Sequence, residues 1–137
     1  LHVVDQAVDN VTDELLAKLD ALLEAQRQLG KDTMRFLICD REFHLAIYRA
    51  CGNPLLTDFV VDLYGYLMEQ RRHAMAVPGA TQNSYDDHVA IVDALRRRDR
   101  KAVVEAFRGH LTRIYETTRE MRARPPLEER RAGRNGT

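Results

Sequence analysis

The stretch FLICDREFHLAI, residues 36–47, decides the fold. Its apolar side chains recur three and four positions apart, the spacing that places residues on one face of an α-helix. The same face carries two polar residues, Asp40 and His44, which are four apart and therefore neighbours on the helix. The stretch predicts a buried helix whose inward stripe is Phe36, Leu37, Asp40, Phe43, His44 and Ile47.

Helical spacing extends in both directions from this stretch, without an alternating strand pattern of any length. Thr12 suits a helix N-cap, and Gly52-Asn53-Pro54 predicts a helix end followed by a restart. Pro78-Gly79 predicts a break, with a loop over 80–83 and a new cap at Ser84. The sequence therefore predicts an all-α antiparallel bundle of about six helices, at 2–9, 13–29, 32–50, 54–77, 84–97 and 99–122.

The expected organisation is one domain with a tail. Residues 1–124 are enough for a compact core. Pro125-Pro126 ends the helical pattern, and the charged residues after it predict a flexible tail over 125–137. The chain begins at Leu1, without Met, in sequence typical of the middle of a helix. We therefore expect a fragment from which an N-terminal part has been removed.

Composition excludes some classes of partner. The 21 Lys and Arg balance the 21 Asp and Glu, whereas a protein that binds DNA through its phosphates carries a basic excess. Cys39 and Cys51 lack CxxC spacing and predict structural thiols in a reducing cytoplasm. No apolar run approaches the roughly 20 residues of a membrane span, and no signal peptide is visible. We expect a cytoplasmic domain that binds neither membrane nor DNA by itself.

Two further predicted helices also carry a polar residue within an apolar stripe. His88 is followed by apolar residues at +3, +4 and +7. Burying one carboxylate and three imidazoles without partners would be costly, and a divalent metal would satisfy all of them. The candidate ligands are Asp40, His44, His88 and His110, the last of which shares a face with Val103, Phe107, Leu111 and Ile114.

This donor set suits Zn²⁺, Ni²⁺, Mn²⁺ or Fe²⁺, with zinc favoured, and open positions on the metal could accept a small carboxylate. The alternative is that each histidine is a core residue satisfied by hydrogen bonds. An Asp-x-x-x-His pair is also commonly a simple ion pair. The metal interpretation rests on three separate helices that each turn such a residue inward.

Two other residues are candidates for binding an effector. Arg71 falls on the helix face of Leu63, Leu67 and Ala74, where it could clamp a ligand carboxylate. Alternatively, it pairs with a buried acid or extends to the surface. Tyr85 could line a pocket, or pack with its hydroxyl at the edge of the core, and the same holds for Tyr64 and Tyr66.

Several motifs together resemble one family. Residues 40–47, DREFHLAI, resemble the D-x-x-F-H-x-x-(I/L) signature of FadR C-terminal (FCD) domains, which belong to GntR-type bacterial transcription factors. Residues 50–56, ACGNPLL, resemble that family's A-x-G-N-x-x-L motif, and 87–95 its E-H-x-x-I-x-x-A-(I/L) motif with Asp for the usual Glu. Arg98-Asp99 stands where Gly-Asp is common, and 102–111, which are one residue longer, resemble the family's A-x-x-x-(M)-x-x-H-L. The resemblance covers 12–122 in the right order.

The resemblance implies an FCD bundle that senses an effector and forms a homodimer, and not an enzyme. In the family's metal-binding branch, the ligands are the D and H of D-x-x-F-H, the H of E-H and the H of H-L. These fall on the four residues named above. The resemblance further implies a small organic-acid effector near the metal, and a winged helix-turn-helix that reads operator DNA in the missing N-terminal part. Effector binding is expected to shift the placement of the two DNA-binding heads.

Other interpretations stay open. A metal-dependent helical hydrolase, DinB-like or HD-like, would need a general base, and Asp87 is expected to point away from the His88 face. The same sensor domain without metal would bind its effector through the histidines directly. A free-standing interaction module is the third. For the dimer interface, we expect the outward apolar residues Phe59 and Tyr66 to contribute.

Overall fold

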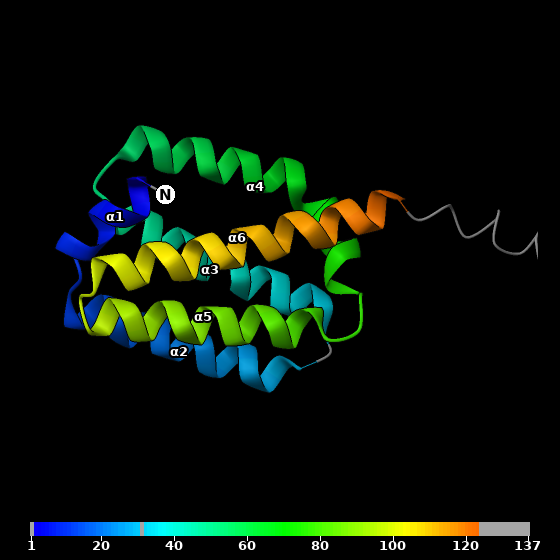
Figure 1. Ribbon diagram of the computed structural model, residues 1–137, viewed down its shortest axis with the longest axis horizontal. Helices are drawn as coiled ribbons and strands as arrows, with labels where there is room; N and C mark the ends of the chain where they lie inside the picture. The colour runs from blue at the N-terminus through cyan, green and yellow to red at the C-terminus, as the bar shows by residue number, and fades with distance from the viewer. Residues whose placement is uncertain (1, 31, 124–137) are drawn as a thin grey trace, which may run out of the picture.

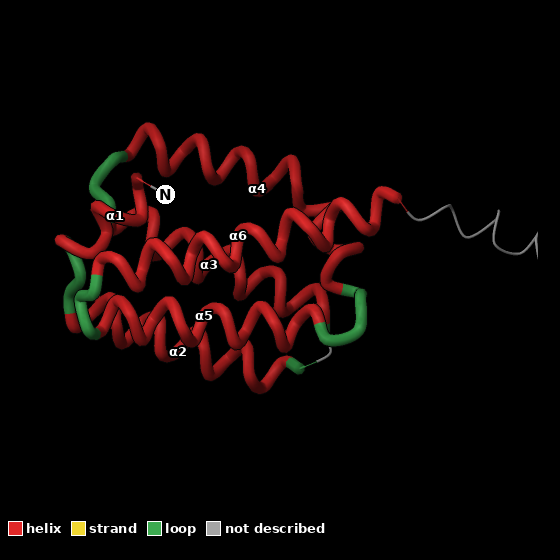
Figure 2. Tube along the Cα trace, in the orientation of Figure 1, coloured by secondary structure: helices red, strands yellow, loops and turns green. Residues whose placement is uncertain are grey.

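The computed structural model describes residues 2–30 and 32–123, which form six α-helices and, within those ranges, no strand (Figures 1 and 2). The predicted all-α bundle is therefore confirmed, while the predicted tail over 125–137 lies outside the described residues. The helices are α1 (His2–Asp9), α2 (Asp13–Leu29), α3 (Thr33–Ala50), α4 (Pro54–Met75), α5 (Ala80–Arg96) and α6 (Arg100–Ala123).

Helix α3, which contains the stretch FLICDREFHLAI, lies in the middle of the bundle. It packs against α1, α2 and α4. Helices α5 and α6 form an antiparallel pair across the front of Figure 1, and α5 also packs on α2. Helix α4 lies along the upper edge in that view, against α3 and α6. Short turns at both ends of the bundle connect the helices (Figure 2).

The core lies where α2, α3, α5 and α6 meet, with α1 covering one end. All six residues of the predicted α3 stripe are buried. Burying each large apolar side chain stabilises the fold by roughly 1.5–3 kcal/mol. On α6 the buried face is narrower than predicted, because Leu111 is 41% exposed. The fully buried apolar side chains include Leu19, Phe43, Ile47, Ile91, Leu95, Val103 and Phe107.

The start of α5 differs from prediction, whereas the start of α2 agrees with it. Residues 80–83, expected to be a loop, are the first turn of α5, because Gly79 adopts φ 82° and its carbonyl accepts the Asn83 amide at 3.0 Å. Ser84 is consequently buried inside the helix instead of capping it. Thr12 caps α2 as predicted, accepting the Leu15 amide at 3.1 Å.

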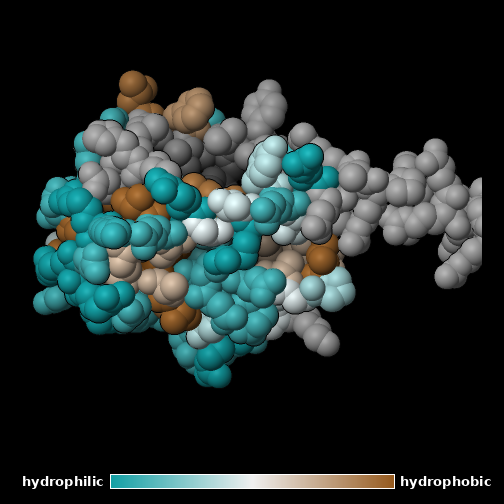
Figure 3. Space-filling view, in the orientation of Figure 1, coloured by the Kyte–Doolittle hydropathy of each residue, from teal (hydrophilic) through white to brown (hydrophobic). Residues whose placement is uncertain are grey.

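The surface is mostly hydrophilic over α5 and α6, whereas apolar atoms stand out near the start of α4 (Figure 3). Leu55 and Phe59, four apart on α4, are 82% and 62% exposed. The side chain of Tyr66, the other residue expected at an interface, lies outside the described residues. Cys39 and Cys51 are buried free thiols. Across the described part of the chain, no helix has the length and apolar character needed to cross a membrane.

Candidate metal centre

Four polar side chains from three helices meet in the middle of the bundle. Asp40 and His44 come from α3, His88 from α5 and His110 from α6, and each is at most 1% exposed. Asp40 Oδ1 lies 3.2 Å from Nε2 of both His44 and His88. His110 Nε2 lies 3.3 Å from the same two nitrogens, and all four atoms lie within 4.8 Å of one another. The four residues selected from the sequence are thus together in space.

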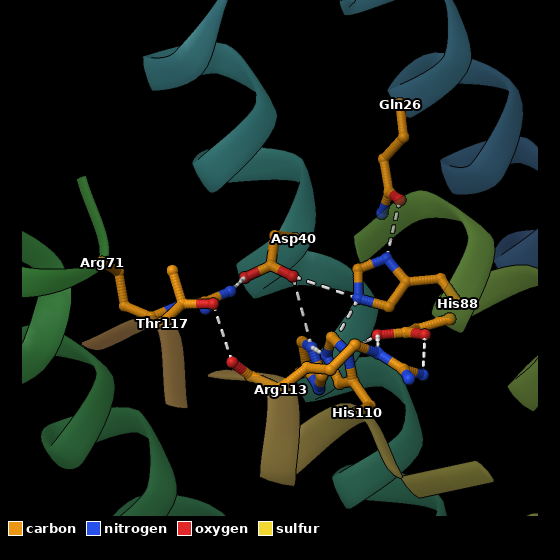
Figure 4. Close-up of polar contacts among 9 residues, drawn as sticks. Gln26, Asp40, Arg71, His88, His110, Arg113 and Thr117 are labelled. Atoms are coloured by element: carbon orange, nitrogen blue, oxygen red, sulfur yellow. Dashed lines mark hydrogen bonds and ion pairs between the residues drawn. The ribbon is translucent and has the colours of Figure 1, made fainter. Parts of the chain in front are cut away.

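The outer nitrogens of two of these histidines contact oxygen acceptors (Figure 4). His88 Nδ1 lies 2.7 Å from Gln26 Oε1, and His110 Nδ1 lies 3.0 Å from Asp87 Oδ2. These acceptors favour the tautomer with the proton on Nδ1. The lone pair of each Nε2 is then directed into the cluster, where a cation is the natural partner for facing lone pairs.

Burial keeps these imidazoles neutral. Burial lowers the pKa of His88, and it lowers the pKa of His110 to about 3, with the nearby His44 and His88 adding to the effect. Neutral imidazole is the form that binds a metal. Burial alone would raise the pKa of the Asp40 carboxyl, but His44, His88 and Arg71 hold it well below its usual range. Asp40 is therefore a carboxylate at neutral pH.

The cluster leaves one acceptor unsatisfied. Asp40 Oδ2 accepts a hydrogen bond from Arg71 Nη2 at 3.0 Å. Among the described residues, Asp40 Oδ1 has no hydrogen-bond partner of acceptable geometry, although two imidazole nitrogens are near it. A buried carboxylate oxygen without a partner is costly, and metal coordination would remove that cost.

The spacing of the donors fits a single ion. Ligand atoms about 2.0–2.2 Å from one ion lie about 3–3.5 Å apart when they subtend about 90–110° at it. The separations of 3.2 and 3.3 Å between neighbouring donor atoms fall in this range, and the two opposite pairs lie within 4.8 Å. Phe43 helps to fix the ring of His88, since the two rings stack with centroids 4.3 Å apart. The residues present therefore fit a divalent metal bound by three nitrogens and one carboxylate.

The orientation of the Asp87 side chain differs from the prediction. It was expected to point away from the His88 face, but it is buried and contacts His110, and Arg113 donates to both of its oxygens. The reason is that Asp87 shares a stripe with Ser84, Ile91 and Ala94, which are all buried on α5. That spacing of three, four and seven was readable in the sequence.

Gln26 was also missed. It is 2% exposed on α2, and it follows Leu19, Leu22 and Leu23 at helical spacing. A polar residue on that stripe is the same signal that identified His88. Arg113 is half out of the bundle, with 55% of its side chain exposed, and no apolar stripe marks it in the sequence.

Arg71 and Tyr85, the two candidate effector residues, line different cavities. Arg71 is buried and paired with Asp40, as one of the alternatives for it required. It lines a cavity of about 140 Å³ together with Ser84, Asp87 and Arg113. Tyr85 is half-buried and lines a cavity of about 790 Å³ at the end of the bundle. The side chain of Tyr64 lies outside the described residues.

Comparison with known proteins finds relatives that are similar in sequence and one that is similar in fold. The HTH-type transcriptional repressor NanR of Cronobacter sakazakii is 35% identical over 120 residues, which cover 84% of this chain and 45% of the relative. The repressor of the same name from Salmonella typhimurium is 32% identical over 120 residues, covering 84% and 44%. The structure of E. coli McbR/YncC has a TM-score of 0.68 at 23% identity, covering 84% of this chain and 58% of that one, and it shows the fold alone.

The chain spans less than half the length of these curated relatives. By name they are regulators of transcription and not enzymes, in agreement with the expectation from the motifs. The family profile of the FCD domain matches residues 1–113, which include all four residues of the cluster. On this match and on its all-α bundle, the chain belongs to the FCD-domain family of GntR-type transcription regulators.

Proposed function

We propose that this chain is the sensing domain of a bacterial transcription regulator, and that it binds a divalent metal and a small carboxylate effector in the bundle core. Asp40, His44, His88 and His110 would hold the metal, with zinc favoured among Zn²⁺, Ni²⁺, Mn²⁺ and Fe²⁺. The observation that carries the proposal is the convergence of three imidazole Nε2 atoms on a carboxylate oxygen that has no hydrogen-bond partner among the described residues.

Arg71 supports the carboxylate effector. Its Nη2 donates to Asp40, while its Nη1 is buried and has no hydrogen-bond partner in the described part of the chain. Arg71 lines the cavity of about 140 Å³ that reaches Asp87 and Arg113. A small carboxylate there would accept from Nη1. When bound, the metal would supply an open position for a second carboxylate oxygen.

The whole protein would act on DNA through a further domain. Its relatives are named HTH-type repressors and are more than twice as long as this chain's matched part, and this chain has no net charge with which to bind DNA. We place a winged helix-turn-helix outside this chain and a homodimer interface on α4, where Leu55 and Phe59 are exposed on one face. Effector binding would then shift the equilibrium between two placements of the DNA-binding domains.

Elemental mass spectrometry tests the metal centre. Protein purified without a metal-affinity column is compared with a His88→Ala/His110→Ala variant. About one transition metal per chain is expected in the wild type, and it should be lost in the variant. A wild type that takes up no metal, even after reconstitution, refutes the centre and leaves the alternative of an effector bound by the histidines and Arg71 directly.

A metal-dependent hydrolase is less well supported than a sensor. Asp87 is an acidic residue beside the cluster and the candidate for a general base. Both of its oxygens, however, accept hydrogen bonds from Arg113, and Oδ2 also contacts His110. A base must be within reach of a proton on water or substrate. Asp87 is better suited to orienting His110 than to removing such a proton.

A further inference from the structure

A second and larger cavity lies at the end of the bundle, away from the four candidate ligands. It has a volume of about 790 Å³ and is bounded by the end of α2, the start of α3, and the turn between α4 and α5, at the right of Figure 1. This volume is in the range of small-molecule sites, about 300–1,000 Å³. Its apolar lining includes Phe36, Met75 and Val77.

Gln26 gives this cavity a buried polar group. It lines the cavity but is only 2% exposed. Its Oε1 is engaged by His88 Nδ1 at 2.7 Å. Its Nε2 has no hydrogen-bond partner of acceptable geometry among the residues described, although the Gln26 side chain interacts with the Cys39 thiol and opposes the rise in that thiol's pKa caused by burial. An unsatisfied buried amide costs about 1–3 kcal/mol. A ligand acceptor in the cavity would satisfy it.

The start of α5 gives the cavity a preference for anions. Gly79 is the N-cap and makes no side-chain capping bond, so the Thr81 and Gln82 amides receive no acceptor from it, whereas the Ala80 amide bonds the Val77 carbonyl at 3.0 Å. Gly79, Thr81 and Gln82 all line the cavity. Free amides and the positive end of the helix dipole favour negative charge at such a position. Arg27 also lines the cavity, but its guanidinium is paired with Glu24 at 2.6 Å, so it adds little net positive charge.

We propose that this cavity is a second binding site, which takes a small organic anion with an apolar body. The anionic group lies at the start of α5 and accepts from Gln26 Nε2, and the apolar body covers Phe36 and Met75. The site is separate from the cavity at Arg71. Met75 lines both cavities and forms the wall between them.

Gln26 also links this site to the cluster, a step that rests on the proposed metal centre. A ligand that accepts from Nε2 polarises the amide and strengthens the bond that Oε1 accepts from His88. A stronger acceptor on Nδ1 makes His88 Nε2 a better metal ligand. Anion and metal should therefore each raise the affinity for the other by the same factor.

The site itself is tested on metal-free protein by nuclear magnetic resonance, with benzoate as the probe and benzyl alcohol as its uncharged counterpart. Benzoate should shift the backbone amides of Thr81 and Gln82 and the side-chain amide of Gln26, and benzyl alcohol should shift them much less. Thr81→Glu should abolish the benzoate shifts, and the uncharged Thr81→Gln should keep them. Three outcomes would overturn the site. Benzoate could cause no shifts, it could shift only residues near Arg71, or it could shift the two variants equally.

The link is tested by zinc titration with and without benzoate. Benzoate should tighten zinc binding several-fold in the wild type and in Gln28→Leu, an exposed control on the same helix, but not in Gln26→Leu. Equal zinc affinity with and without benzoate in the wild type overturns the link while leaving the site standing. A protein that binds benzoate but no zinc refutes the metal centre, and the link with it, while leaving the site standing.

Discussion

Asp87 holds His110 in place from the side opposite the four candidate metal ligands, with Oδ2 lying 3.0 Å from Nδ1. Arg113 in turn donates to both oxygens of Asp87. Burial would raise the pKa of Asp87, but Arg113 and His110 together lower it, so this group is a carboxylate at neutral pH. An imidazole that donates to a carboxylate presents its other nitrogen as a lone pair in a fixed direction.

Asp87→Asn should therefore weaken metal binding by about 10–100-fold, the usual effect of losing such a partner. The amide keeps the shape but lacks the charge that favours Nδ1–H on His110. Competition with a chelating dye measures the affinity. Asp86→Asn, at the exposed neighbouring position, should leave it unchanged. Equal affinities for the two variants would show that Asp87 does not orient the ligand.

Arg71 should stabilise the metal-free domain through Asp40. Removing one partner of a buried ion pair costs about 3–5 kcal/mol, because the other charge stays buried. Arg71→Met should lower the free energy of unfolding by this order without metal, and by less with zinc, which would give Asp40 a new partner. Urea unfolding with and without zinc measures both values, and Arg72→Met, at an exposed position, is the control. The same loss with and without zinc contradicts the prediction.

Lowering the pH should destabilise the metal-free domain. The folded pKa of His110 is about 3 and that of His88 is also lowered, in both cases first by burial, whereas an unfolded histidine has a pKa of about 6.5. Below about pH 6.5 the unfolded chain therefore binds protons that the folded chain does not, and stability falls with pH. A histidine that stays neutral in the folded chain contributes at most about 1.4 kcal/mol per pH unit, a limit approached only well below its unfolded pKa.

Urea unfolding between pH 7.5 and 5.5, with chelator present, measures this slope. His110→Gln should make it shallower, because the variant lacks one of the two histidines whose pKa burial lowers. A midpoint that does not move with pH in the wild type would mean that the histidines become protonated without unfolding the bundle.

The sequence predicted the four clustered residues because each sits within an apolar stripe, and helical periodicity alone then turns it inward. The same rule would have found Gln26 and Asp87, which lie on the stripes of Leu19 and Ile91. Arg113 could not be found in this way, because it lies on the exposed face of α6 and only its guanidinium contacts Asp87. Arg71 and Tyr85 line different cavities because of the way α4 and α5 pack. Residue spacing within one helix does not determine that packing.

The exposed apolar face at the start of α4 should contribute to a homodimer. Phe59→Glu places a charge on the face that Leu55 shares, and burying a charge without a partner is costly. Sedimentation should therefore show a dimer for the wild type and a monomer, or a much weaker dimer, for the variant. Asp58→Asn changes a neighbouring exposed residue and should remain dimeric. A variant that is still fully dimeric places the interface elsewhere.

Arg98 occupies a position that suits glycine. It adopts φ 52°, in the left-handed region, immediately after the α5 C-cap Arg97. Its amide bonds the Leu95 carbonyl at 3.0 Å, and the Asp99 amide bonds the Ala94 carbonyl at 3.1 Å. This pair of bonds is the Schellman motif, in which the left-handed residue is usually Gly. It gives a physical reason for the Gly in the Gly-Asp motif that Arg98-Asp99 resembles.

Arg98→Gly should stabilise the domain by about 0.5–1 kcal/mol. The left-handed conformation costs an ordinary residue about 1–2 kcal/mol, and the greater flexibility of unfolded glycine offsets about 0.5–1 kcal/mol of the gain. Thermal or urea unfolding of the metal-free domain measures the change. Arg97→Gly is the matched control, because Arg97 has φ −76°, where glycine relieves no strain. The substitution adds entropy to the unfolded chain and also removes the exposed ion pairs of Arg97 with Asp93 and Asp99. Arg97→Gly should lower the free energy of unfolding, whereas Arg98→Gly should raise it. Changes of the same sign would mean that the turn is not held in this conformation in solution.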